Sequence, residues 1–464
     1  MSLTLDVLRA AARDIAAAVS SGQMSARAVT AAALGHVDAR NPQLNAFTDI
    51  TRARALAKAA AIDAGHAPRG ALAGVPYAVK NLYDVAGVVT RAGSKINRDN
   101  AAAATDAFVV EKLEAAGAVL LGALDMDEYA YGFTGENVHD GDSRNPHDPR
   151  HMTGGSSGGS AGAVASGMVA FALGSDTNGS IRVPASLCGL FGLKPTYGRL
   201  SRRGVFPFVA SLDHVGVLAR SAGDLALAYD AMQGRDSGDP AQAAREAEHV
   251  LPLLSQGATG LRIAVAGDYF RRSGRPECFA AVDAVAAALG ATRDVVVPSA
   301  AAARAAAFVI TAAEGAAFHL SRLRQRPQDF DAAVRDRLFA GAMIPAEAVL
   351  RAQKLRAWFR GRINALFEEV DIVLTPATPC RAPLSGQKTI EIDGADVPVR
   401  ANLGLYTQPI SFIGLPALTV PLWTPGEHLP IGVQIIGPPW REDLILRVAH
   451  ELERKGVAHA PVAP

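Results

Sequence analysis

The chain has 464 residues, 49% hydrophobic and 20% charged, which is enough apolar material for a large buried core and excludes a disordered protein. Its formal net charge is +1, with 46 Lys and Arg against 45 Asp and Glu, so nothing favours direct binding of nucleic acid or of an anionic membrane. The three cysteines form no C-x-x-C pair, which predicts neither a zinc site nor a disulfide framework. A cytoplasmic protein is therefore expected.

Residues 5–65 show two or three alanine-rich helical patterns, with breaks near SSGQ and NPQLN. The first pattern carries charged residues inside its apolar periodicity, which predicts an amphipathic helix and not a signal peptide. We expect these N-terminal helices, residues 1–65, to pack on the core or to extend from it. The longest weakly polar run, residues 161–174, is too short and too rich in small residues to span a bilayer.

An apolar run bounded by glycine, residues 71–79, predicts a buried strand. The next periodic segment, residues 105–117, predicts a helix with Thr105 as its N-cap and Gly117 just after its end. Residues 118–124, AVLLGAL, then predict a second buried strand.

Strand and helix patterns alternate again over residues 261–300 and 352–376. Alternation of this kind predicts strands packed between helices, an α/β fold. The most polar region, residues 233–257, is expected to be a surface excursion. We predict one domain over residues 1–464, with a semi-independent lobe over 225–400 left open as the alternative.

A glycine- and serine-rich stretch, HMTGGSSGGSAG at residues 151–162, has the composition of a flexible linker. It runs, however, into a small-residue segment and then into a second such loop, SDTNGSIRVPAS at residues 175–186. Two loops separated by one short unit can lie side by side, and glycine lets successive N–H groups converge on one anionic atom. Such a group of N–H donors beside a serine is what an oxyanion hole requires, although two unrelated surface turns are the alternative.

A nucleophilic serine also needs a base. Three histidines, His139, His147 and His151, fall in a polar loop, where capping and solvation are the expected roles. Lys80 is a different candidate because it ends an apolar strand, and burial lowers the pKa of a lysine until the neutral amine can accept a proton. The alternative is a lysine whose amine extends out of the strand end into solvent.

Three segments in this order and spacing, GVPYAVKN, GGSSGGSAGAVASG and GSDTNGSIRVPASLCGLFGLKPTYGRLSR, resemble the amidase signature family of serine amidohydrolases. Further similarity at GLPALTVPL and LPIGVQIIGPP extends the resemblance over nearly the whole chain. The resemblance implies the amidase signature fold, a large mixed β-sheet sandwiched between α-helices. It also implies a hydrolase that needs neither a metal nor an organic cofactor.

The same resemblance implies a Ser–cis-Ser–Lys triad. Ser180 matches the nucleophile, and Ser156 matches the bridging serine that follows a cis peptide bond. Lys80 matches the base, which draws a proton from Ser180 through Ser156. The implied chemistry is acyl transfer, in which Ser180 attacks an amide carbonyl, ammonia leaves and water hydrolyses the acyl-enzyme.

The implied oxyanion hole consists of four backbone N–H groups, those of Thr177, Asn178, Gly179 and Ser180. Asn178 departs from the family pattern, which has glycine there. A left-handed backbone conformation is therefore less accessible at this residue, and the Asn side chain can enter the site. Three further residues match supporting roles: Asp176 and Arg182 as an ion pair, and Ser157 as a structural hydrogen-bonding group.

The prediction of the substrate rests on the charged residues expected in its binding site. Arg337 falls where the glutaminase subunits of tRNA-dependent amidotransferases, one similar branch of the family, keep a carboxylate-binding arginine. The acidic residue of that branch corresponds here to Gly404, and ANLGLYTQPISFIG contains no carboxylate. We therefore expect a small amide with a carboxylate and no ammonium, as in the more similar 1-carboxybiuret hydrolase branch. The expected wall residues are Tyr131, Gly132, Phe133 and Gln408.

Two alternatives remain open at this point. Residues 154–158 also satisfy G-x-S-x-G, the nucleophile elbow of α/β-hydrolases, which would make Ser156 the nucleophile. That elbow requires a hydrophobic strand before it, whereas the polar NPHDPRHMT precedes it here. The chain can also be the catalytic part of a homo- or hetero-oligomer with a small helical partner subunit, as both branches of the family suggest.

Overall fold

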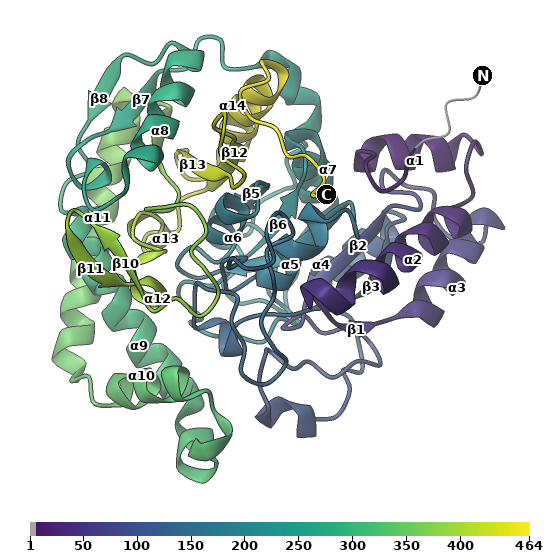
Figure 1. The fold of residues 1–464 in the computed structure, drawn as a ribbon, viewed down its shortest axis with the longest axis horizontal. Coiled ribbons are helices and arrows are strands. Elements are labelled where there is room, and N and C mark those ends of the chain that lie inside the picture. The colour runs from purple at the N-terminus through teal and green to yellow at the C-terminus, as the bar shows by residue number, and fades with distance from the viewer. Residues whose placement is uncertain (1–5) are drawn as a thin grey trace.

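The computed structural model describes residues 6–464 and contains one large sheet of eleven strands (Figure 1). Across the sheet the strands lie in the order β1 (Phe47–Ile50), β3 (Val119–Leu124), β2 (Pro76–Lys80), β4 (Phe171–Asp176), β6 (His214–Ala219), β5 (Phe191–Lys194), β12 (Ala417–Leu422), β13 (Ile431–Ile436), β9 (Ile372–Pro376), β7 (Ile263–Ala266) and β8 (Arg293–Val295). A separate hairpin pairs β10 (Thr389–Ile392) with β11 (Ala395–Pro398).

The sheet is mixed. β2 is parallel to β3 and β4, and β7 is parallel to β8 and β9, whereas the other neighbours are antiparallel. The helices are α1 (Ala12–Ser20), α2 (Ala26–Leu44), α3 (Arg52–Asp63), α4 (Phe108–Ala115), α5 (Gly158–Ala165), α6 (Arg182–Leu187), α7 (Ala222–Met232), α8 (Pro276–Leu289), α9 (Ala300–Gln325), α10 (Ala332–Ala342), α11 (Ala346–Glu369), α12 (Val399–Asn402), α13 (Gln408–Ser411) and α14 (Glu442–Arg454). The predicted α/β class with a large mixed sheet is confirmed.

The middle of the sheet is buried on both faces, and its sequence is correspondingly apolar. Every residue of β2, β3 and β4 is buried, which is why these strands appear as continuous hydrophobic runs rather than alternating ones. The strand predicted over 118–124 is present as β3. The strand predicted over 71–79 begins only at Pro76, because Gly74 adopts a left-handed φ of 72° in the turn that precedes it.

The predicted N-cap of α4 is wrong. The helix begins at Phe108 with Ala107 as its N-cap, and no side chain caps it. Its first backbone N–H groups have tertiary partners instead, since Ala107 donates to the carbonyl of Asp84 and Phe108 to that of Arg203. The C-terminal prediction fits better, because Gly117 has a φ of 93° directly after the helix.

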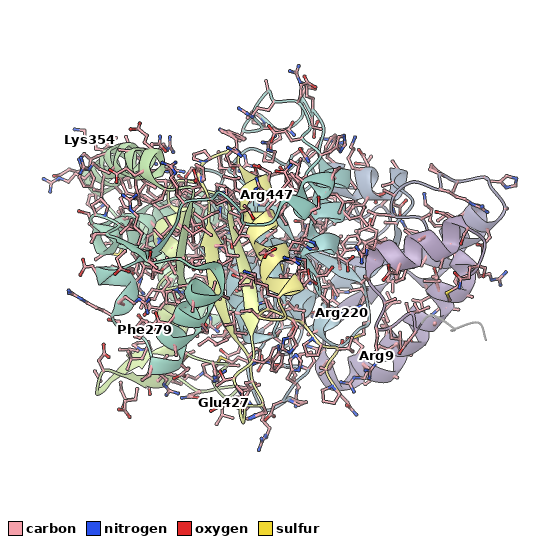
Figure 2. All side chains as sticks on the ribbon, turned by 90° about the horizontal axis from the view of Figure 1, so that it is seen from above. Arg9, Arg220, Phe279, Lys354, Glu427 and Arg447 are labelled. Atoms are coloured by element: carbon pink, nitrogen blue, oxygen red, sulfur yellow. The ribbon has the colours of Figure 1, made fainter. Side chains whose placement is uncertain are left out.

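At the N-terminal end, α1, α2 and α3 lie at one side of the molecule, with α9, α10 and α11 at the opposite end (Figure 1). The first predicted helix begins at Ala12, and residues 1–5 lie outside the described residues. The sequence analysis missed β1, a short strand that pairs with β3. Arg220, labelled in Figure 2, is buried and donates to the carbonyls of Ala10, Val164 and Val169, which ties this end to the core.

Among the described residues, α9 is long and apolar enough by composition to cross a membrane. It packs against α10, α11 and α13. Ten of its residues are buried, and Thr311 on this helix accepts a hydrogen bond from the loop that carries Ser180. These contacts account for the apolar composition of α9 within the folded protein.

Candidate active site

Lys80 is the last residue of β2, and its side chain is completely buried. Its Nζ donates to Ser156 Oγ at 2.6 Å and to Ser175 Oγ at 2.9 Å. Burial lowers the pKa of the amine to about 7, against the weaker opposing effect of Asp127. A large fraction of the amine is therefore neutral near pH 7, and the alternative of a lysine extending into solvent is wrong.

The two Ser/Gly loops lie side by side. The backbone N–H of Ser157 donates to the carbonyl of Ser180 at 3.3 Å. The Ser157 hydroxyl donates to the carbonyl of Ser175 and accepts from its N–H, both at 3.3 Å. Ser157 therefore joins one loop to the strand that leads into the other. The peptide bond between Gly155 and Ser156 is cis.

Ser180 lies just before α6 and lines a cavity. Among residues 6–464, the Ser180 hydroxyl makes no hydrogen bond, so the geometry joins Lys80 to Ser156 directly but does not join Ser156 to Ser180. Catalytic hydrogen bonds are often long in the absence of substrate and tighten when it binds. The hydroxyl of Ser180 is thus left available to a ligand.

Three of the four backbone N–H groups expected to form the oxyanion hole are free in the loop that carries Ser180. The N–H of Gly179 donates to Asp176 Oδ1 at 2.7 Å and is already used. The N–H groups of Thr177, Asn178 and Ser180 have no acceptor within the described part of the chain. The four-donor oxyanion hole implied by the sequence therefore reduces to three free donors in this conformation.

Asn178 fits its position without backbone strain. Its φ lies outside the left-handed region, and only the following Gly179 needs a positive value, 139°. The side chain does enter the site, because Nδ2 donates to Thr311 Oγ1 on α9 at 2.8 Å while Oδ1 is buried without a hydrogen-bond partner among the described residues. The Asn178 carbonyl accepts from Thr407 Oγ1 at 2.6 Å.

Asp176 and Arg182 form an ion pair beneath this loop, with both side chains fully buried. Burial raises the pKa of the Asp176 carboxyl, but the guanidinium of Arg182 outweighs it and holds that pKa well below its usual value. Arg182 also donates to Gln434 Oε1 at 2.7 Å and to the carbonyl of Thr407 at 3.2 Å. The pair thereby fixes the loop against β13 and the segment before α13.

The cavity at Ser180 has a volume of about 210 Å³. All five residues expected to bind substrate line it: Tyr131, Gly132, Phe133, Arg337 and Gln408. Sequence reasoning missed other lining residues, which no local motif marks: Phe208, Phe308, Thr311, Ala333, Pro398, Arg400 and Ala401. None of the residues that line this cavity is acidic, and two are arginines.

The two arginines differ in their partners. Arg337 lies with its guanidinium carbon 3.8 Å from the centre of the Tyr131 ring, and it donates to the Tyr131 carbonyl and, at 2.9 Å, to that of Ala333. No described carboxylate pairs with it. Arg400, by contrast, lies 3.4 Å from carboxylate oxygens of both Glu136 and Asp331. Arg337 is thus the cation that remains for an anionic ligand.

Gly404 packs against an aromatic ring. A Cβ at this position would lie 2.5 Å from Cζ of Phe133, so any side chain there requires Phe133 to move. Gln408, four residues further on, accepts from Arg304 Nε at 2.8 Å through its Oε1. Position 404 therefore offers no room for a carboxylate while Phe133 lines the cavity.

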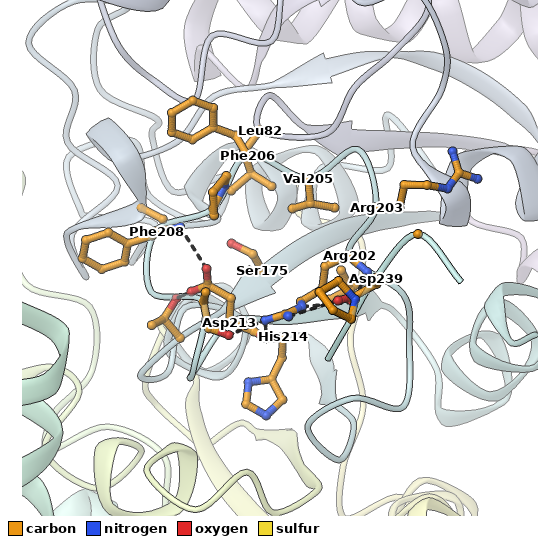
Figure 3. Close-up of a pocket in the computed structure, with 17 residues that line it drawn as sticks. Leu82, Ser175, Arg202, Arg203, Val205, Phe206, Phe208, Asp213, His214 and Asp239 are labelled. Atoms are coloured by element: carbon orange, nitrogen blue, oxygen red, sulfur yellow. Dashed lines mark hydrogen bonds and ion pairs between the residues drawn. The ribbon is translucent and has the colours of Figure 1, made fainter. Parts of the chain in front are cut away.

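A second cavity has a volume of about 160 Å³, and its lining residues are drawn in Figure 3. It shares Ala130, Thr177 and Phe208 with the cavity at Ser180 and therefore lies next to it. It contains neither Ser156 nor Ser180, but Ser175 lines it. The polar segment 233–257 reaches this cavity through residues 238–240 and does not line the cavity at Ser180.

The α/β-hydrolase alternative finds no support. Residues 143–157 form no strand, and only isolated bridges precede the loop that holds Ser156. His139 bonds to Glu128 Oε1 at 2.9 Å, and His147 to the carbonyl of Cys188 at 3.1 Å. Burial lowers the pKa of His147 to about 4, and none of the described histidines lines the cavity at Ser180.

A buried lysine–serine pair, a neighbouring serine at a helix start and free backbone donors are groups that can support the hydrolysis of an amide. The amidase family profile matches residues 28–446. The chain belongs to the amidase signature family and is an amide hydrolase.

The most informative relative is AtzE, the 1-carboxybiuret hydrolase subunit of Pseudomonas sp. (strain ADP). It is 54% identical over 451 residues, which cover 96% of this chain and 98% of the relative. A glutamyl-tRNA(Gln) amidotransferase subunit of Pseudomonas aeruginosa is 38% identical over 473 residues, covering 95% of this chain and 96% of that protein.

Solved structures agree with both similarities. One, described as a vestigial protein complex that reveals the evolutionary origins of an s-triazine catabolic enzyme, superposes with a TM-score of 0.95 at 52% identity and covers 97% of this chain and 100% of the other. The corresponding glutamyl-tRNA(Gln) amidotransferase subunit of Thermotoga maritima superposes with a TM-score of 0.82 at 28% identity, covering 99% of each chain.

Proposed function

We propose that this protein hydrolyses the terminal C–N bond of a small amide that carries a carboxylate and no ammonium group, with 1-carboxybiuret as the leading candidate. The observation that carries the proposal is the cavity at Ser180: Arg337 lines it without a carboxylate partner among the described residues, and none of the residues that line it is acidic. Free glutamine would bring an ammonium group for which this cavity has no counter-ion. The similarity to AtzE supports the same substrate class.

In the proposed reaction, Ser180 Oγ attacks the amide carbonyl while its proton passes to Ser156 Oγ and the proton of Ser156 passes to the neutral amine of Lys80. The free N–H groups of Thr177, Asn178 and Ser180 stabilise the tetrahedral oxyanion.

Collapse of that intermediate breaks the C–N bond, and the proton returned by Lys80 through Ser156 lets the nitrogen leave as ammonia. Water then attacks the acyl-enzyme by the same proton route, which releases a carboxylate product and regenerates Ser180.

The substrate proposal is tested by measuring ammonia release from glutamine, biuret, 1-carboxybiuret, oxamate and simple aliphatic amides. We expect kcat/KM to be highest for amides that carry a carboxylate. In Arg337→Met, KM for these substrates should rise by about tenfold or more, while uncharged amides are unaffected. A clear preference for glutamine would contradict the proposal and favour a glutaminase subunit.

The roles of the two serines are tested separately. Ser180→Ala should abolish acyl-enzyme formation, measured by mass spectrometry after rapid quenching, whereas Ser156→Ala should slow it by about a hundredfold or more. A Ser180→Ala enzyme with full activity would leave Ser156 as the nucleophile and refute the proposed triad.

We further propose that the protein works in the cytoplasm together with a small helical partner subunit. Three cysteines, all buried and free, support a reducing compartment, and both of the curated relatives described above are themselves named as subunits. Gel filtration of this chain co-expressed with its genomic neighbours tests the partner. A monomer with full activity alone would contradict it.

A further inference from the structure

Three side chains that take no part in the proposed reaction meet on the surface, outside the cavity at Ser180. Asp148 and His151 come from the loop that leads into the Gly155–Ser156 peptide, and His428 comes from the loop between β12 and β13. Asp148 and His428 are 280 residues apart in the chain. No sequence motif therefore marks the cluster. His151 was expected, together with His139 and His147, to cap or solvate a loop.

The spacing of the three side chains suits a metal ion. His151 Nδ1 and His428 Nε2 lie 3.2 Å and 3.3 Å from the same oxygen, Asp148 Oδ2, and all three ligand atoms fall within 4.8 Å of one another. Tetrahedral zinc with bonds near 2.0–2.1 Å places its ligand atoms about 3.3 Å apart. Two edges of the triangle thus already have the length that zinc requires.

A second observation is that the Nδ1 atom of His151 has no hydrogen-bond partner among the described residues. This atom is buried, and Asp148 Oδ2 is only 3.2 Å away. The nitrogen therefore faces a carboxylate oxygen without donating to it. A cation between the two atoms would satisfy both.

Arg150 is the cation that now holds the carboxylate. Its Nη2 donates to Asp148 Oδ2 at 2.7 Å and its Nε to Oδ1 at 3.0 Å. The side chain of Arg150 is 78% exposed, so its Nη2 can return to water at little cost when Oδ2 binds a metal. The bond to Oδ1 would remain and would orient the carboxylate.

We propose that Asp148, His151 and His428 form a binding site for Zn²⁺ or a similar transition-metal ion, with water as the fourth ligand. Two imidazoles and one carboxylate are ligands that favour such an ion over Mg²⁺, which prefers six oxygens. The metal joins the loop before Ser156 to the loop between β12 and β13. It takes no part in the hydrolytic chemistry.

Calorimetric titration of the metal-free full-length enzyme with ZnCl₂ tests the site. We expect one Zn²⁺ per chain and no comparable binding of MgCl₂. His428→Asn should bind Zn²⁺ at least about tenfold more weakly, because a ligand is lost. Arg150→Ala should bind it more tightly, because the competing cation is removed. The matched control is His66→Asn, which replaces an exposed histidine in another part of the chain and should leave the affinity unchanged.

Weaker Zn²⁺ binding by His428→Asn together with tighter binding by Arg150→Ala distinguishes this site from scattered surface binding. Amide hydrolysis by His428→Asn at saturating substrate should equal that of the parent enzyme, which shows that the variant is folded. The absence of Zn²⁺ binding by the parent chain, or equal affinity in the parent and in His428→Asn, would overturn the proposal.

Discussion

In the proposed mechanism, the pH dependence of hydrolysis follows from the environment of Lys80. Full burial moves the pKa of this amine from 10.5 to about 7, and only the neutral form can accept the proton from Ser156. Because the active form is the deprotonated one, kcat/KM should rise with pH and level off above the pKa. With a pKa near 7, about one-tenth of the chains are active at pH 6 and about nine-tenths at pH 8, so we expect roughly a tenfold increase.

The assay is initial-rate ammonia release at substrate concentrations well below KM, between pH 5.5 and 9.5. Such rates report ionisations of the free enzyme and substrate, and an amide substrate with no group titrating near pH 7 isolates the enzyme. Lys80→Met serves as the control and should lose at least about a hundredfold in kcat/KM, with no remaining inflection near pH 7. A profile of the parent enzyme that climbs log-linearly past pH 8.5 would show an unperturbed lysine and refute the reasoning.

The loop that carries Ser180 yields two further predictions. Gly179→Ala should lose most activity and about 1–3 kcal/mol of stability, because its Cβ would lie 2.1 Å from Thr407 Oγ1 at a φ of 139°; wild-type kcat with an unchanged urea midpoint would contradict this. Arg182→Met should lower the free energy of unfolding by about 3–5 kcal/mol, since it leaves the Asp176 carboxylate buried without its partner. Calorimetry should then show a lower Tm than in the parent enzyme, and an unchanged Tm would argue against the ion pair as an anchor.

Local sequence patterns predicted the interior of the fold better than its boundaries. The continuous apolar run at β3 was predicted correctly, because six consecutive buried residues between turn signals fit a strand that is covered on both faces. The N-cap at Thr105 failed for the opposite reason. The N–H groups of Ala107 and Phe108 bond to carbonyls that come from distant parts of the chain, so the helix start needs no local cap.

Some features of the candidate site were predicted from the sequence, and others became visible only in the structure. The resemblance to the amidase signature family implied that Lys80 and Ser156 meet, and the structure places the Lys80 amine 2.6 Å from the Ser156 hydroxyl. The tertiary structure alone decided that the N–H of Gly179 is bound to Asp176 and that Arg400 joins the cavity wall.

The amino-acid order by itself determined the α/β class and the two serine loops, and it offered Lys80 as a candidate base, because these features arise from burial and backbone freedom within short segments. Only the folded chain decided the charge balance of the cavity and the meeting of Asp148 with His428. Both depend on segments that are distant in sequence and are brought together by packing, which no local pattern encodes.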